Sequence, residues 1–137
     1  MRTVYPVIFT ETKDCVLVEV PDLQILTEGK DMVDAIDMAR DAIGLHGISL
    51  EDAQLPIPEA SAIEKIDPAK GTFAEDGKSI VSMVDIDFSE YRRKVDNKTV
   101  RRNVTLPNWL NREAEAAHIN VSKVLQDALM AKLNVSR

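Results

Sequence analysis

Hydrophobic residues in the first part of the chain follow a two-residue period, which is the period of a β-strand. Residues 3–9 and 15–20 are rich in β-branched and aromatic side chains and are separated by a polar turn, which predicts a hairpin. Residues 23–27 follow the turn signal Pro-Asp and are expected to form a third strand. A last strand is expected at 79–88, where hydrophobic residues again alternate.

Between the third and fourth predicted strands the pattern changes to a helical period. The apolar stripe repeats every three or four residues and comprises Met32, Ala35, Ile36, Ala39, Ala42 and Ile43. Asp31 is a natural N-cap for this helix, and Gly44 or Gly47 is expected to end it. Residues 51–78 contain prolines and a turn signal, so we expect an extended, loop-rich connection there.

The predicted order of elements over residues 1–90 is strand, strand, strand, helix, strand. This order indicates an α+β domain in which a single helix covers one face of the sheet. We therefore expect the other face to be polar or to meet a partner. Residues 89–98 are charged and poor in large aliphatic side chains, and we place a linker at 91–98. A second module is predicted over residues 99–137.

The second module begins with a short segment, 100–106, that alternates in polarity. One side of this predicted strand carries Val100, Arg102, Val104 and Leu106, and the other carries Arg101, Asn103 and Thr105. Pro107 ends the strand and is expected to begin a first helix at 107–117. Asn120 is expected to cap a second helix, in which apolar residues again recur at helical spacing.

One strand and two short helices within about forty residues bury little apolar surface by themselves. The strand also has no pairing partner within its own segment. A two-fold dimer solves both problems, because two copies of 100–106 pair antiparallel and four helices enclose one shared core. We therefore expect a homodimer through the C-terminal strand and helices, and we leave open whether dimers pair into tetramers.

The outer face of such a two-stranded ribbon has the chemistry needed to read bases in the major groove of DNA. Arg101 would fork to guanine, Asn103 would pair with adenine, and Thr105 would contact a base through its hydroxyl or methyl group. Free N–H groups at the start of the second helix would bind a phosphate, and this predicted clamp comprises Asn120, Val121 and Ser122. The alternative is a strand face that is merely exposed to solvent.

Charge is divided unevenly between the two predicted modules. The net charge is −6, but residues 1–90 carry 7 basic and 19 acidic residues, whereas residues 91–137 carry 10 basic and 4 acidic residues. A basic module suits a polyanion, and an acidic module suits a basic protein partner. The split therefore indicates two modules with different partners.

Other features limit the classes of function and location. The single cysteine, Cys15, cannot form an internal disulfide, and the sequence shows neither a signal peptide nor an apolar run of about 20 residues, so we expect a cytoplasmic protein without membrane contact. His46 is expected to close the predicted helix and His118 to lie in the turn between the last two helices. No Gly-rich phosphate loop, paired-cysteine zinc pattern or serine nucleophile motif occurs. We expect no cofactor, no metal and no catalytic residue.

The segment RRNVTLPNWLNREAEAAHINVSKVLQDAL resembles a ribbon-helix-helix DNA-binding domain, because its order of strand, proline, helix, break and helix matches throughout. Two positions differ from the usual pattern. Arg102 lies where an apolar residue is more common, and His118 lies where glycine is common. The resemblance implies a dimer that binds operator DNA.

The front of the chain resembles the HicB antitoxin family through YPVIF, VLVEVPDL, TEGKDMVDAIDMARDAIGLHG and LPIPEAS, in that order. The two resemblances together cover nearly the whole chain. They imply a β-β-β-α-β domain, a degraded relative of the ribonuclease H fold, followed by a ribbon-helix-helix module. They also imply a type II antitoxin that neutralises a HicA-like, mRNA-cleaving toxin and represses its own operon. A ligand-sensing ribbon-helix-helix regulator without a toxin partner is the alternative.

The relation to ribonuclease H raises the question of nucleic-acid cleavage, which needs several carboxylates at one point to hold metal ions. The candidates are Asp31, Asp34, Asp37, Asp41, Asp85 and Asp87. Those at 34, 37 and 41 share a helix face opposite the apolar stripe, so we expect them to point to water, away from the sheet. The first predicted strand contains no carboxylate. We therefore expect the front domain to be catalytically inactive.

Overall fold

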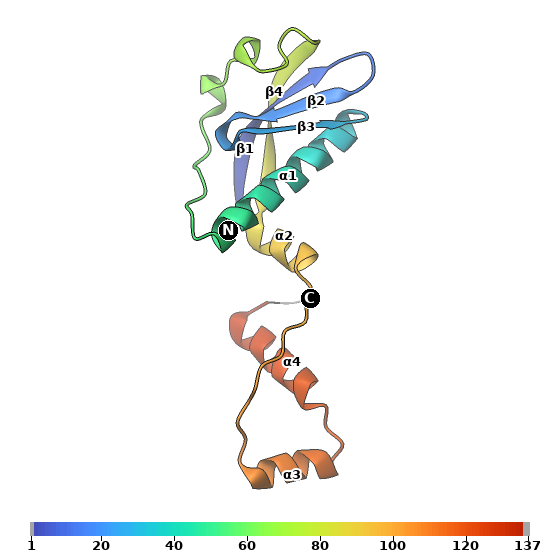
Figure 1. Ribbon diagram of the computed structural model, residues 1–137, viewed down its shortest axis with the longest axis vertical. Helices are drawn as coiled ribbons and strands as arrows, with labels where there is room; N and C mark the ends of the chain where they lie inside the picture. The colour runs from blue at the N-terminus through green and yellow to red at the C-terminus, as the bar shows by residue number, and fades with distance from the viewer. Residues whose placement is uncertain (1, 136–137) are drawn as a thin grey trace. The chain divides into compact units, whose positions relative to one another are not determined.

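The computed structural model describes residues 2–135, and the chain divides into two compact units, unit 1 (Met1–Lys98) and unit 2 (Thr99–Arg137) (Figure 1). Unit 1 is built on a four-stranded antiparallel sheet with the strand order β3-β2-β1-β4. Its strands are β1 (Arg2–Glu11), β2 (Val16–Val20), β3 (Ile25–Gly29) and β4 (Lys78–Asp87). The four predicted strands are confirmed, although β3 begins later than expected because a 3₁₀ turn at Pro21–Leu23 precedes it.

A long helix, α1 (Met32–Asp52), covers one face of the sheet (Figure 1). Asp31 caps it as predicted, because its side chain accepts a hydrogen bond from the Asp34 N–H at 2.8 Å. The core between helix and sheet includes Tyr5, Val7, Phe9, Val18, Ala35, Ala39 and Ile43. Ala35 and Ala39 leave room on the helix for the larger side chains of the strands, so the two layers approach closely.

The prediction that Gly44 or Gly47 ends α1 is wrong, because both glycines are buried inside the helix. A second helix, α2 (Phe88–Val95), packs against them. A Cβ atom on Gly44 would overlap the ring of Tyr91, and one on Gly47 would overlap the ring of Phe88. The glycines therefore allow two aromatic rings to approach the helix backbone.

The linker predicted at 91–98 is wrong for the part that α2 occupies, since this helix continues to Val95. Arg92 ties α2 to the end of α1. Its Nη2 donates hydrogen bonds to the backbone carbonyl of Ile48 and to the carboxylates of Glu51 and Asp52, at 3.3, 3.0 and 2.9 Å. The sequence did not indicate this helix because α2 has no stripe of aliphatic side chains. It is attached to α1 by the rings of Phe88 and Tyr91 and by the guanidinium of Arg92.

The connection between α1 and β4, residues 53–77, which we call the strap, begins beside the core at Ile57 and reaches the other face of the sheet around Gly71. Hydrogen bonds to the sheet and the β2–β3 turn anchor it: Tyr5 Oη donates to the Pro58 carbonyl at 2.6 Å, the Ser61 hydroxyl to Asp22 at 2.6 Å, and the Thr72 hydroxyl to Glu19 at 2.9 Å. Ile8 lies against the strap at Gly71 and is only 4% exposed. The expectation that this face is polar or needs a partner is therefore wrong around Ile8, where the chain covers itself.

Unit 2 contains two helices, α3 (Asn108–Ala116) and α4 (Val121–Leu133), which lie close to their predicted ranges. Asn120 caps α4 as predicted, because its side chain accepts from the Lys123 N–H at 3.1 Å. The strand predicted at 100–106 is absent from the single chain, since the described residues there belong to no helix or strand. A strand is held by hydrogen bonds to a neighbouring strand, and unit 2 provides none among its described residues.

None of the described residues of unit 2 is buried. Its exposed large apolar side chains are Val100, Val104, Trp109, Leu110, Ile119, Val121, Val124, Leu129 and Leu133. The side chain of Val100 is 78% exposed and that of Trp109 is 64% exposed. In the single chain, unit 2 therefore has two formed helices but no hydrophobic core of its own.

Candidate functional site

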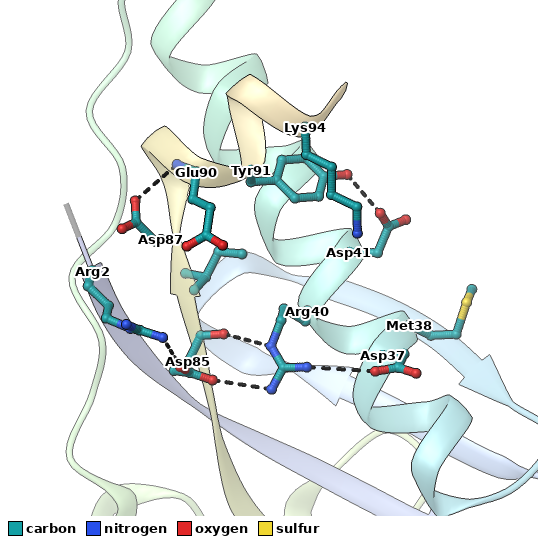
Figure 2. A pocket seen from close by; sticks show the side chains of 11 residues that line it. Arg2, Asp37, Met38, Arg40, Asp41, Asp85, Asp87, Glu90, Tyr91 and Lys94 are labelled. Atoms are coloured by element: carbon teal, nitrogen blue, oxygen red, sulfur yellow. Dashed lines mark hydrogen bonds and ion pairs between the residues drawn. The ribbon is translucent and has the colours of Figure 1, made fainter. Parts of the chain in front are cut away.

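A groove of about 560 Å³ lies in unit 1 between α1, α2 and the end of β4 (Figure 2). Its lining residues are Arg2, Asp37, Met38, Arg40, Asp41, Asp85, Ile86, Asp87, Glu90, Tyr91 and Lys94. Five of these carry a carboxylate and three carry a cation, so the groove has an excess of negative charge. Both helices and β4 contribute charged side chains to it, which makes the groove a product of the tertiary fold.

Asp85 on β4 is held by two arginines (Figure 2). One carboxylate oxygen lies 3.1 Å from Arg2 Nη2, and the other lies 3.2 Å from Arg40 Nη2. These hydrogen bonds hold the pKa of Asp85 below its ordinary value. Arg40 also reaches Asp37 at 3.7 Å, so its guanidinium lies between two carboxylates.

Tyr91 on α2 forms the opposite wall of the groove and donates a hydrogen bond to Asp41 on α1 at 2.8 Å (Figure 2). Burial and the neighbouring Asp41 carboxylate, in that order, raise the pKa of Tyr91 to about 12. Asp87 caps α2 by accepting from the Glu90 N–H at 3.1 Å, and that hydrogen bond lowers the pKa of Asp87. The groove therefore keeps a neutral phenol at one wall, while the pKa values of Asp85 and Asp87 are lowered.

The candidate nuclease carboxylates divide into two sets. Asp31 and Asp34 lie at the start of α1, where Asp31 caps the helix and Asp34 accepts from the Lys30 N–H at 2.7 Å. The other four, Asp37, Asp41, Asp85 and Asp87, line the groove. Asp37 and Asp41 are exposed to water, as expected for that face of α1. The expectation did not include the groove, in which Asp41 accepts a hydrogen bond from Tyr91 of α2.

The carboxylates of the groove do not form a metal site. Within residues 2–135, no three His, Cys, Asp or Glu side chains are arranged to hold a metal ion. Arg40 occupies the position between Asp37 and Asp85 where a cation would be attracted. Chemically, the groove offers ion pairing to a basic side chain more readily than it offers metal-assisted cleavage.

Sequence reasoning missed the cations and the tyrosine of this groove. Arg40 follows Asp37 by three residues, a spacing at which opposite charges meet on one helix face, and this signal was available in the sequence. The contributions of Tyr91 and Lys94 depended on α2, which the sequence did not indicate. Arg2 reaches Asp85 only because β1 and β4 are paired.

The predicted base-reading residues, Arg101, Asn103 and Thr105, all have exposed side chains in unit 2. They lie on the segment that forms no strand in the single chain. The predicted phosphate clamp, Asn120, Val121 and Ser122, lies at the N-terminus of α4 and is exposed. The Asn120 side chain already caps the helix, so the exposed backbone N–H groups of the first turn are what a phosphate would meet.

The remaining candidate residues have structural positions. His46 lies inside α1, so the prediction that it closes the helix is wrong, whereas His118 lies in the turn between α3 and α4 as expected. His118 has a φ of 55°, in the left-handed region where glycine is favoured. Cys15 is half-buried in the turn between β1 and β2. Among the described residues, no helix is both long enough and apolar enough to cross a membrane.

Comparison with known proteins identifies the class to which this fold and groove belong. Residues 5–133 match the family described as the HicB-like antitoxin of bacterial toxin–antitoxin systems. The match spans both units, so the chain belongs to this family and is a HicB-like antitoxin of a toxin–antitoxin system. No match was found among curated proteins.

Solved structures show the same fold. A chain of a toxin–antitoxin complex from Streptococcus pneumoniae is 25% identical with a TM-score of 0.59, and the alignment covers 96% of this chain and 99% of that one. The antitoxin HicB of Burkholderia pseudomallei is 24% identical with a TM-score of 0.52, covering 96% and 97%. A chain of the HicA3 and HicB3 toxin–antitoxin complex is 24% identical with a TM-score of 0.51, covering 62% and 99%. The last two resemblances establish the fold alone.

Proposed function

We propose that this antitoxin binds and neutralises a HicA-like, RNA-cleaving toxin through unit 1 and represses its own operon by binding operator DNA through unit 2. One observation carries the proposal: the family match runs continuously over residues 5–133 and so includes both units. The proposed domains are a toxin-binding domain at 1–90 and a ribbon-helix-helix domain at 99–137. Because α2 continues to Val95, we assign 91–95 to the first domain and keep only 96–98 as the linker.

The charge of unit 1 supports a basic partner. A protein that holds RNA presents a basic surface, and a carboxylate-rich surface complements it. In the groove, carboxylates from α1, β4 and α2 converge within one hollow. We place basic side chains of the toxin at this groove.

Charge reversal at the groove tests the toxin interaction. Glu90→Lys is expected to weaken toxin binding several-fold, mainly through a slower association rate at low salt, because a rim charge acts through steering. The matched control is Glu75→Lys, an equal change at an exposed position of the strap. The association rate of each variant is measured with the purified toxin. Equal rates for both variants would contradict the placement of the toxin at this groove. Absence of any binding by the unaltered protein would reject the toxin partner itself.

The exposed apolar side chains of unit 2 support dimerisation. A segment without a buried residue is not stable alone, and a second copy would cover its apolar helix faces while the two copies of 100–106 pair as a ribbon. The paired strands would place Arg101, Asn103 and Thr105 on one outer face. That face fits the major groove, and the start of α4 would bind a phosphate.

Operator binding is tested with DNA from the promoter region of the operon. Asn103→Ala is expected to lose about 1–3 kcal/mol of operator affinity, the usual contribution of a bidentate base contact. Asn111→Ala, at an exposed position on α3, is the matched control and should bind as the unaltered protein does. Affinity should also fall steeply with salt, because phosphate contacts release counterions. A flat salt response would reject DNA as the ligand of unit 2.

Unit 1 is proposed to be a non-catalytic relative of the ribonuclease H fold. The support is Arg40, which lies between Asp37 and Asp85 in the place where a nuclease would hold a cation. Incubation of the purified protein with Mg²⁺ or Mn²⁺ and labelled RNA should give no cleavage. Cleavage that is abolished by Asp85→Asn would overturn this part of the proposal.

A further inference from the structure

β4 forms an edge of the sheet, because it pairs with β1 on one side and with no described strand on the other. Proteins usually protect such an edge with proline, a bulge or charged side chains, since an open edge pairs readily with another strand. Residues 79–84 read Ser-Ile-Val-Ser-Met-Val and contain neither proline nor charge. The pairing with β1 is continuous through this segment, so there is no bulge either.

A hydrogen bond from α1 shows which backbone groups face the open edge. Arg40 Nε donates to the backbone carbonyl of Asp85 at 3.1 Å, so this carbonyl points away from β1. Residues along an antiparallel strand point their N–H and C=O groups alternately to one side and the other. The backbone groups of Val81 and Met83 therefore also face outward. Within the described chain they have no backbone hydrogen-bond partner.

Apolar side chains flank these outward-facing groups on both faces of the sheet. Ile80 is 43% exposed on the face that carries α1, and Met83 is 45% exposed on the opposite face. The open stretch has clear limits, because Arg40 occupies the carbonyl of Asp85 at one end and the charged Lys78 stands at the other. The edge is thus a short, uncharged, apolar template for one added strand.

We propose that this edge pairs with the same edge of a second copy of the chain, antiparallel and about a two-fold axis. The sequence of β4 is complementary to itself in one register, which places Ser82 opposite Ser82, Val81 opposite Met83, and Ile80 opposite Val84. The two Val81–Met83 pairs then bring accessible apolar side chains together, which is the arrangement that stabilises neighbouring strands, whereas Val84 is already buried in its own core. The outward N–H and C=O groups of Val81 and Met83 meet those of the partner copy.

Neighbouring registers are poorer. Met83 placed opposite Met83 would set Val81 against Asp85, so the Asp85 carbonyl that Arg40 already binds would fall next to the central pair. In the favoured register this carbonyl meets only Ser79, at the end of the open stretch. Val81 placed opposite Val81 would set Ile80 against a serine. A basic toxin is also a poor occupant, because residues 79–84 offer it no carboxylate. Two copies joined in the favoured register would share one continuous sheet, and this pairing is independent of toxin or DNA binding.

A cysteine at position 82 tests the register directly. Residues opposite each other in a non-hydrogen-bonded pair have Cα atoms about 4.5 Å apart, which lies within the range of about 4.4–6.8 Å that a disulfide spans. In full-length protein carrying Cys15→Ser, the added change Ser82→Cys is expected to give a covalent dimer on mild oxidation, visible on a non-reducing gel. Ser49→Cys, an exposed position on α1, is the control in the same background. Cross-linking of Ser82→Cys that does not exceed this control would overturn the proposal.

A second change shows whether strand pairing causes the cross-link. Met83→Pro removes an N–H that faces outward and leaves the hydrogen bonds to β1 intact, so unit 1 should keep its circular dichroism spectrum. Added to Ser82→Cys, it is expected to abolish the disulfide. Val81→Lys is a second disrupting variant, which opposes a charge to Met83 of the other copy. A disulfide that persists in both folded variants would show random collision and reject edge pairing.

Discussion

The two units of this antitoxin contrast in how they obtain a core. Unit 1 encloses Tyr5, Phe9 and Phe88 between its sheet and helices, each at most 2% exposed. Unit 2 forms two helices with clear caps, yet none of its described residues is buried. Local signals such as Asn120 are thus sufficient to define helices, whereas a core depends on how much chain is available to enclose it.

The two units also divide the basic charge differently from the division at residue 91 that the sequence suggested. Much of the basic cluster before residue 99 belongs to α2, and Arg92 is already paired with Glu51 and Asp52 on α1. Residues 99–137 themselves carry 6 basic and 3 acidic residues. Unit 2 is therefore mildly basic, and its proposed DNA binding depends on a few well-placed side chains, doubled in a dimer.

The largest effect is expected from the core of unit 1. Phe88→Ala removes the ring that fills the space beside Gly47, and it should cost about 3–5 kcal/mol of unfolding free energy. Because unit 1 has its own core, this loss should not depend on protein concentration. Urea unfolding at two concentrations measures both points. A cost under about 1 kcal/mol would show that α2 is not part of the core.

A smaller but more revealing effect is expected in unit 2. Leu129 on α4 is 51% exposed in the single chain, and Leu45 on α1 is 56% exposed. If a second copy buries Leu129, Leu129→Ala should cost at least about 2 kcal/mol, whereas Leu45→Ala should cost little. The melting temperature associated with unit 2 should also rise with protein concentration. Equal, small effects of the two substitutions would mean that unit 2 does not dimerise through α4.

Alkaline pH tests how α2 is held within unit 1. The pKa of Tyr91 is raised from 10.0 to about 12 in the folded protein, so the unfolded chain loses this proton first as the pH rises. The stability that the neutral phenol contributes is present below pH 10 and is lost as the pH rises toward 12. Tyr91→Phe should therefore make unit 1 less sensitive to pH in this window. An unchanged slope of urea midpoint against pH would contradict the Tyr91–Asp41 contact.

The smallest expected effect concerns the turn of unit 2. His118 adopts a φ of 55°, which costs a residue with a Cβ atom more than it costs glycine. His118→Gly should therefore increase the free energy of unfolding of unit 2 by up to about 1 kcal/mol, measured as a higher melting temperature. Asn134 has the same φ after α4, and Asn134→Gly should gain less because asparagine tolerates this conformation. Destabilisation by His118→Gly would show that the imidazole makes a contact in the assembled protein.

Sequence reasoning predicted those parts of the fold that depend on neighbours along the chain. The strands of unit 1 and the caps Asp31 and Asn120 follow from local patterns and are confirmed. Gly44 and Gly47 were misread because their role is set by aromatic rings more than forty residues away in the chain, which no local pattern reveals. The sequence pattern of a glycine near the end of an apolar stripe is the same whether the glycine ends the helix or allows an aromatic ring to pack against the helix backbone.

The candidate site was predictable to a similar extent. Four of the groove carboxylates are among the candidates that the sequence offers, but the pairing of Asp85 with Arg2 and Arg40 depends on the fold. Arg101, Asn103 and Thr105 remain predictions, because the strand that would orient them needs a second copy. The sequence thus identifies chemistry more readily than it identifies geometry.

The strap is expected to unfold locally more readily than the rest of unit 1. Residues 53–77 contain only short 3₁₀ turns, and a few side-chain hydrogen bonds hold them to the sheet and to the β2–β3 turn. Such a segment can detach while the sheet and α1 stay folded. We therefore expect amide hydrogens of the strap to exchange with solvent well before those of β1, and a protease to make its first cut there. The lifetime of this antitoxin in the presence of a protease would then depend on how readily the strap detaches and not on the global free energy of unfolding of unit 1.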